Sequence, residues 1–219
     1  MIWLIVALVG AHALRVWVFP QDSDWLFVTY GFVPARYSHA WLDAHGMNPG
    51  TLLDRTLPFV TYMFLHGGFM HVAINCAFLL AFGPAVARRF GSLLFLLFFM
   101  FCGIAGAAVH LACNWGSPAP VIGASGAVSG LMSAGFLLLP TVWADSRQPL
   151  GSIFAPRMLV WTAFFVGVNV FAGVTGMGTG ADVQLVAWQA HLGGYAAGLL
   201  LVWPFDALAR PRAPSRLQA

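Results

Sequence analysis

The sequence contains no lysine and no glutamate, and only 8% of its 219 residues are charged. Soluble domains carry roughly 25% charged residues, so this composition excludes a soluble globular protein. The absence of glutamate also removes the HExxH pattern of zinc metalloproteases. The ten basic residues exceed the seven acidic ones by only +3, which is too little for a basic binding surface, and we expect no nucleic-acid partner.

Cysteine is also scarce, and Cys76, Cys102 and Cys113 form neither a CxxC pair nor a Cys/His zinc spacing. Each lies in or at the edge of an apolar run, so we expect all three to be small buried hydrophobic residues. The sequence therefore predicts no metal and no cofactor.

Long hydrophobic runs are abundant, since 60% of the residues are hydrophobic. A bilayer core about 30 Å thick needs about 20 apolar residues per helical span. Apolar runs between charges, glycines and prolines predict six spans, at about 2–19, 58–82, 92–113, 122–142, 155–175 and 187–204. The first run lacks a basic n-region and a cleavage pattern, so we expect it to stay attached as a span. The predicted fold is an all-α polytopic membrane protein, a single six-helix bundle at 1–209 in the lipid bilayer, with a long first loop at 21–57 and a short tail at 210–219.

The arginines predict an orientation, because basic residues in short loops favour the cytoplasmic side. Six spans place both termini on one side, and seven arginines fall there: Arg88, Arg89, Arg147, Arg157, Arg210, Arg212 and Arg216. The other side has Arg15, Arg36 and Arg55, together with five of the seven aspartates. We therefore expect cytoplasmic N- and C-termini. A compact chain with one short tail fits a bacterial inner membrane best.

Polar side chains inside spans are costly, and they become functional candidates when several share a depth. Pro118 to Pro120 forbids a regular helix, so the helix of the fourth span should begin around Gly123 to Ser125 and end near Pro140. Such a helix is about 22 Å long, shorter than the bilayer core, and it leaves Ser125 below the outer surface.

Two histidines are predicted at the same level. His71 and His191 each lie 13 residues before a proline, Pro84 and Pro204, which we take as the inner ends of their helices. Both rings are then about 20 Å from those ends. Three inward-running helices thus place one Ser and two His side chains at a common depth.

The residues around Ser125 have the pattern of a serine nucleophile. Gly123-Ala124-Ser125-Gly126 is similar to the GxSG setting in which glycines expose the serine at a helix N-terminus. Small residues in apolar helices equally serve helix packing, and Gly126 with Gly130 also forms a GxxxG pair. The pattern alone leaves both interpretations open.

The sixth span offers a partner for Ser125. His191, Gly194 and Gly198 share one helix face at i, i+3 and i+7. Packing of this face against Gly126 would bring His191 beside Ser125, where a neutral imidazole can accept the hydroxyl proton. A histidine in a membrane helix can instead cap a backbone carbonyl or serve a proton pathway.

In the second span, His71 and Asn75 share a face at i, i+4. Together with backbone N–H groups at the start of the fourth helix, around Gly123, they could bind a developing oxyanion. Hydrogen bonding between helices is the alternative role. His66 lies off this face and is expected to pack the loop above the site.

Three ordered motifs therefore stand on six spans: His66-x4-His71-x3-Asn75, Gly123-x-Ser125-Gly126, and Ala190-His191-x2-Gly194-x3-Gly198. With these motifs, the chain resembles the rhomboid intramembrane serine proteases across almost its whole length. The resemblance implies that Ser125 is the nucleophile, that His191 is the general base and acid of a dyad, and that His71 and Asn75 line the oxyanion hole. The implied substrates are other membrane proteins, cleaved in or near a transmembrane helix.

The chain departs from the family at two places. The first loop has Thr56-Leu57-Pro58-Phe59 where members often carry a Trp-Arg pair, and Ser129 stands where some members place a Tyr under the catalytic ring. The sequence does not identify what supports the His191 ring, and neither Asp145 nor Asp182 is placed to be a third member. The family implies a lateral gate, for which span five and the stretch 173–180 are candidates, although glycines there equally suit a flexible loop.

Other classes fit less well. Aspartyl intramembrane proteases need paired Asp residues inside spans, whereas all seven here fall in loops or at span ends. Intramembrane His and Asn can mark a transport path, but the two halves show no repeat of broken helices. A catalytically inactive relative that binds membrane clients would have no chemical need for both Ser125 and His191. We therefore expect an intramembrane serine endopeptidase.

Overall fold

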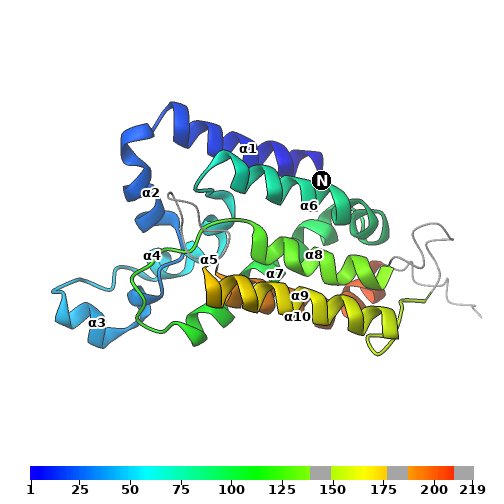
Figure 1. The fold of residues 1–219 in the computed structure, drawn as a ribbon. Coiled ribbons are helices and arrows are strands. Elements are labelled where there is room, and N and C mark those ends of the chain that lie inside the picture. Colours follow the sequence, from blue (N-terminus) through cyan, green and yellow to red (C-terminus); the bar gives the residue numbers. More distant parts are fainter. Residues whose placement is uncertain (139–148, 177–186, 210–219) are drawn as a thin grey trace, which may run out of the picture.

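The computed structural model describes residues 1–138, 149–176 and 187–209, and regular structure in these ranges is helical (Figure 1). The one β-type pairing within them is an isolated bridge between Phe32 and Val121. This confirms the all-α class. The elements are α1 (Ile2–Trp17), η1 (Pro20–Asp22), α2 (Ser23–Tyr30), η2 (Pro34–Tyr37), α3 (His39–Ala44), α4 (Leu52–Thr56), α5 (Pro58–Thr61), η3 (Tyr62–Phe64), α6 (Phe69–Phe90), α7 (Ser92–Cys113), α8 (Ser125–Leu138), α9 (Pro156–Thr175) and α10 (Trp188–Ala209).

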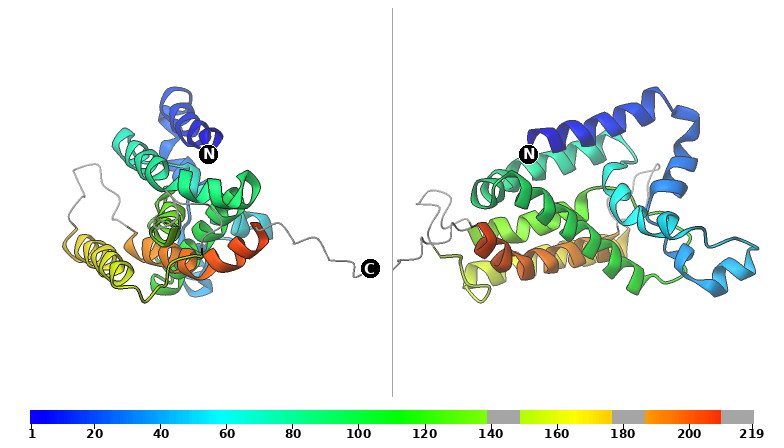
Figure 2. Two further views of the ribbon diagram at one scale, coloured as in Figure 1. Left: turned by 90° about the vertical axis from the view of Figure 1, so that its right-hand side faces the viewer. Right: turned by 180° about the vertical axis from the view of Figure 1, so that it is seen from behind.

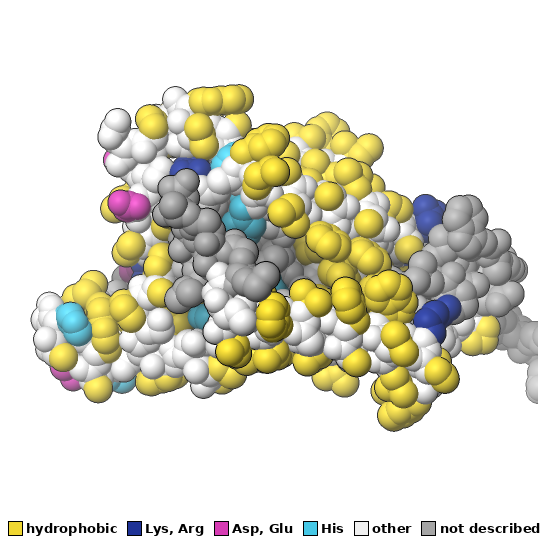
Figure 3. Space-filling view, in the orientation of Figure 1, with side chains coloured by type: hydrophobic (Ala, Val, Ile, Leu, Met, Phe, Trp, Pro, Cys, Tyr) yellow, Lys and Arg dark blue, Asp and Glu magenta, His cyan; other side chains and the backbone are white. Residues whose placement is uncertain are grey.

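Four of the described helices, α6, α7, α9 and α10, are long and apolar enough to cross a membrane. A fifth span is formed if α1 and the segment Pro20–Tyr30, which meet at a bend of 99°, count as one. The remaining predicted span corresponds to α8, a shorter apolar helix of 14 residues. Figure 3 shows a band of hydrophobic side chains, with basic side chains at one end and both acidic and basic ones at the other, as expected for a chain embedded in lipid.

Helix α8 lies at the centre of the bundle. The end-on view of Figure 2 shows it surrounded by α6, α7, α9 and α10, and it contacts all four. All of its residues except Ser125 and Met132 are buried. Because α8 is short and enclosed, its N-terminal residue Ser125 lies inside the protein.

Glycines allow α8 and α10 to cross at close range. A Cβ atom added to Gly194 would overlap the carbonyl oxygen of Gly126, and one added to Gly198 would overlap the backbone of Gly130. The small-residue faces that the sequence pairs are therefore in contact. Helix α7 joins the same crossing, because a Cβ at Gly106 would lie 2.7 Å from the Ala190 carbonyl oxygen.

The expectation that Pro84 and Pro204 mark helix ends is wrong. Both prolines lie inside their helices, which continue to Phe90 and Ala209. Neighbouring helices can stabilise the backbone groups that a proline frees in a membrane protein, so a proline need not end the helix. The predicted interval 58–82 contains α5, η3 and the first part of α6 rather than one helix.

An ion pair joins the far ends of α6 and α10. Arg89 donates to Asp206 through Nε and through Nη2, the latter at 3.1 Å, and both side chains are buried. The sequence predicts every aspartate in a loop or at a span end, and Asp206 lies in the last turn of α10, where this pairing compensates its charge.

The first loop folds into short helices that pack on an aromatic cluster of Phe32, Tyr37, Phe59 and Tyr62. Paired backbone bonds between Phe32 and Val121, of 2.9 and 2.8 Å, tie the loop to the segment before α8. The Tyr37 hydroxyl donates to the Arg55 carbonyl at 2.6 Å, and burial raises the pKa of Tyr37 to about 12. These contacts hold the loop without a Trp-Arg pair.

The cysteines are free thiols in three environments. Cys102 is buried and Cys76 is partly buried, but Cys113 is exposed at the end of α7. The expectation of three buried cysteines is therefore wrong at Cys113, the last residue of α7.

Candidate active site

A glycine positions Ser125. Gly123 has φ +113°, which L side chains rarely adopt, and this turn delivers the chain into α8 two residues later. The Gly123 N–H donates to the Tyr62 carbonyl at 2.9 Å, which fixes the turn against η3. The Ser125 side chain is thereby held at the N-terminus of a buried helix.

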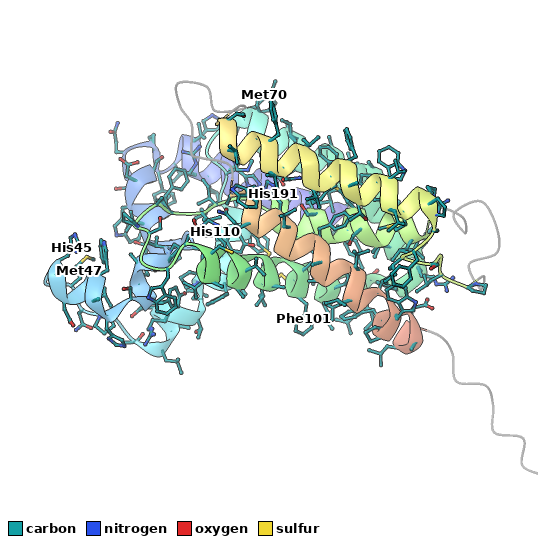
Figure 4. The ribbon with its side chains drawn as sticks, turned by 60° about the horizontal axis from the view of Figure 1, so that its bottom comes forward. His45, Met47, Met70, Phe101, His110 and His191 are labelled. Atoms are coloured by element: carbon teal, nitrogen blue, oxygen red, sulfur yellow. The ribbon has the colours of Figure 1, made fainter. Side chains whose placement is uncertain are left out.

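His191 faces Ser125 from α10. Its Nε2 lies 2.7 Å from Ser125 Oγ, although the two residues are 66 positions apart in the chain. Figure 4 shows His191 near the start of α10, next to α9. The distance is that of a good hydrogen bond, and both residues are partly buried.

The other nitrogen of the His191 ring has a partner that the sequence analysis did not single out. Nδ1 of His191 lies 2.7 Å from Oδ1 of Asn169 on α9. The Asn169 amide nitrogen in turn donates to the Phe165 carbonyl at 2.9 Å. A polar residue inside an apolar span was the available signal for Asn169.

His71 and Asn75 lie on α6 beside the turn that precedes α8. The His71 ring packs directly on Gly123, where an added Cβ would come within 2.6 Å of Nε2. Asn75 is buried and donates one amide hydrogen to the His71 carbonyl at 2.9 Å, which leaves its second amide hydrogen for another acceptor.

Backbone donors complete this region. The Val128 N–H donates to the Ala124 carbonyl at 2.9 Å, so the N–H groups of residues 125–127 precede the first intrahelical bond of α8. The Gly123 N–H is used by Tyr62, and Gly123 therefore contributes space for the His71 ring rather than a free donor.

Two other residues named by the sequence, Ser129 and His66, take supporting positions. The Ser129 hydroxyl donates to the Ser125 carbonyl at 2.7 Å and does not support the His191 ring. His66 is buried, with its ring edge-to-face against His71 at 5.0 Å between centroids. Asp145 and Asp182 lie outside the described residues, as do 177–180 of the glycine-rich stretch and the tail 210–219. Within the described ranges, no three His, Cys or Asp side chains are grouped to hold a metal ion.

Comparison with known proteins identifies the family. The Rhomboid domain model matches residues 54–207. Putative rhomboid protease YdcA of Bacillus subtilis is 28% identical over 184 residues, covering 83% of this chain and 82% of the relative. RHOMBOID-like protein 1 of Arabidopsis thaliana is 30% identical over 69% of this chain, and Rhomboid protease GluP of Bacillus subtilis is 31% identical over 64%.

The chain spans 34% of the length of the Arabidopsis relative and 24% of the length of GluP. The match of the family model nevertheless covers well over half of this chain, from α4 to α10. It includes Ser125, His191 and the helices that carry them. The chain therefore belongs to the rhomboid family.

Proposed function

We propose that this protein is an intramembrane serine endopeptidase that cleaves transmembrane segments of other membrane proteins. The observation that carries the proposal is the 2.7 Å separation of His191 Nε2 and Ser125 Oγ at the N-terminus of the enclosed helix α8. A hydroxyl within hydrogen-bond reach of a neutral imidazole is the arrangement that nucleophilic catalysis by serine requires.

The reaction follows from this geometry. His191 Nε2 takes the proton of the Ser125 hydroxyl as Oγ attacks the scissile carbonyl of the substrate. The resulting tetrahedral oxyanion collapses to an acyl-serine as His191 returns the proton to the leaving amine. Water, activated by the same ring, then hydrolyses the ester and restores the hydroxyl.

The oxyanion needs hydrogen-bond donors, and we propose that three kinds supply them. These are the N–H groups that open α8, the second amide hydrogen of Asn75, and the His71 ring beside Gly123. Removing one such donor from a serine protease costs about 2.7 to 4 kcal/mol of transition-state stabilisation. We assign His71 and Asn75 to this role.

The names of two Bacillus subtilis relatives, one a rhomboid protease and the other a putative one, support peptidase activity. The apolar helices support an integral membrane location. We propose a bacterial inner membrane with both termini in the cytoplasm, since Arg88, Arg89 and Arg157 gather where α6 ends and α9 begins. Reporter fusions at the C-terminus test this orientation, which an active periplasmic phosphatase fusion would contradict.

The decisive experiment is covalent labelling of the detergent-solubilised protein by a fluorophosphonate probe. We expect labelling of the wild type and of Ser133→Ala, in which α8 loses a hydroxyl that bonds the Gly130 carbonyl. We expect none in Ser125→Ala or His191→Ala. Labelling that persists in Ser125→Ala would exclude Ser125 as the nucleophile. A folded wild type that does not label would favour a client-binding protein over an enzyme.

A further inference from the structure

We propose that Asn169 on α9 is a positioning residue that fixes the tautomer and orientation of His191. This inference rests on the proposed function and adds a third side chain to the Ser125 and His191 pair. It is drawn from the 2.7 Å contact between Asn169 Oδ1 and His191 Nδ1.

The hydrogen-bond network assigns the protons. The Asn169 amide nitrogen is committed as a donor to the Phe165 carbonyl at 2.9 Å, so the oxygen of the amide faces the ring. An amide oxygen only accepts, and Nδ1 of His191 must therefore carry the proton. In this tautomer the lone pair of a neutral ring is on Nε2, directed at the Ser125 hydroxyl 2.7 Å away.

Asn169 also stabilises the protonated, positively charged form of the His191 ring. When His191 takes the serine proton, its Nδ1–H becomes a more acidic donor, and the Asn169 carbonyl dipole stabilises it. An aspartate performs this task in the Ser-His-Asp arrangement, and a neutral amide performs it in Cys-His-Asn proteases. A neutral amide also avoids placing an additional charge inside the bilayer.

The helix that carries Asn169 makes this contact unusual. Only Met158 and Phe165 are buried on α9, so most of the helix faces outward. Its inward face carries Thr162, Phe165 and Asn169, spaced i, i+3 and i+7. The Thr162 and Tyr195 hydroxyls lie 2.9 Å apart, and Phe165 stacks on the Tyr195 ring at 4.3 Å. Figure 4 shows α9 running alongside α10 past His191.

One consequence is that Asn169 orients His191 only while α9 stays packed against α10. An outward shift of α9 would break the bond to Nδ1 and free the ring to rotate or to change tautomer. Return of α9 to the position that it has in the structure would re-form the bond and so restore His191 as the base. Residue 169 would thus couple the position of this helix to the reactivity of Ser125.

Thr162→Val provides the matched control. It removes a second hydrogen bond between α9 and α10, that of Thr162 with Tyr195, but leaves His191 untouched. Asn169→Leu removes the acceptor of His191 and keeps the branching and the number of heavy atoms of the side chain. His71 on α6 and His110 on α7 are the titratable groups that act electrostatically on His191, and neither variant changes them.

We expect Asn169→Leu to react with the fluorophosphonate probe about 5- to 100-fold more slowly, because a buried imidazolium donor is left without an acceptor. The loss should appear in the maximal labelling rate rather than in the half-saturating probe concentration. The acidic limb of the labelling profile should move to lower pH, since the charged ring loses its partner. Thr162→Val should label at close to the wild-type rate with an unchanged profile.

Wild-type labelling with equal labelling of Asn169→Leu would overturn this inference and leave the proposed function intact. An equal loss of labelling rate in Thr162→Val would also overturn it, because a looser packing of α9 on α10 would then explain both effects. Should Asn169→Leu not fold, ¹⁵N NMR of the labelled imidazoles in the wild type decides the question. A proton on Nδ1 of His191 is expected, and a proton on Nε2 of the neutral ring would refute the assignment.

Discussion

Gly106→Ala tests whether the crossing of α7 and α10 sets the position of His191. The new Cβ atom would lie 2.7 Å from the Ala190 carbonyl oxygen, whereas real Cβ contacts are essentially never under 3.0 Å and are ordinary from 3.4 Å. The helices must therefore separate by roughly 0.3 to 0.7 Å at this point. Since Ala190 directly precedes His191, any movement of α10 carries the base with it.

The expected effect on reactivity follows from that displacement. A misplacement of about 1 Å costs an enzyme about 100-fold in rate, so roughly 0.3 to 0.7 Å corresponds to about 4- to 25-fold slower labelling of Ser125. Overpacking the crossing should also lower the free energy of unfolding by about 1 to 3 kcal/mol. Neither effect requires a change in any side chain that touches the substrate.

The assay measures the fluorophosphonate labelling rate and the thermal unfolding temperature in the same detergent. Gly10→Ala on α1 is the matched control, because nothing lies within 4 Å of its added Cβ atom. It should label normally, and its helix should gain up to about 1 kcal/mol from the better helix former. A folded Gly106→Ala protein that labels at the wild-type rate would refute the reasoning.

Two further predictions concern stability. Asp206→Asn removes the carboxylate that faces Arg89 and should lower the free energy of unfolding by about 3 to 5 kcal/mol. The control Arg88→Gln changes an exposed arginine and should be near neutral. Equal effects of the two variants would contradict a buried ion pair. Burial keeps Tyr37 protonated in the folded loop up to its pKa of about 12, above the ordinary value of 10.0. Between about pH 10 and 12 the unfolded chain loses this proton while the folded protein keeps it, so the stability that Tyr37 contributes below pH 10 is lost over this range. The unfolding temperature of the wild type should therefore fall between about pH 10 and 12, and that of Tyr37→Phe should fall less.

Much of this architecture could be predicted from sequence because few alternatives exist in a bilayer. Apolar runs of the required length must be helical, and intramembrane glycines are typical of close crossings. The one-sided spacing of His191, Gly194 and Gly198 predicts the face that α10 turns toward α8. The structure has that contact and brings Ser125 and His191 within hydrogen-bond distance.

The helix ends were harder to predict, because they depend on contacts between distant segments. A proline ends a helix when its freed carbonyl has no other partner, and the sequence around Pro84 and Pro204 does not reveal what packs beside them. The pairing of Arg89 with Asp206 spans 117 positions. Gly106 was overlooked for the same reason, since its neighbour Ala190 belongs to a helix three elements later in the chain.

Asn169 illustrates the limit most clearly. An asparagine in an apolar helix can satisfy its amide by bonding the carbonyl one turn back, and Asn169 does bond Phe165 in this way. That local bond is a sufficient explanation from sequence alone, so nothing in the chain requires a partner on another helix. The partner follows from how closely α9 approaches α10, which Gly173 permits, because a Cβ there would overlap the Trp188 ring at the start of α10. The glycine therefore serves as a contact point between the two helices, and through it the position of α9 determines whether Asn169 reaches His191.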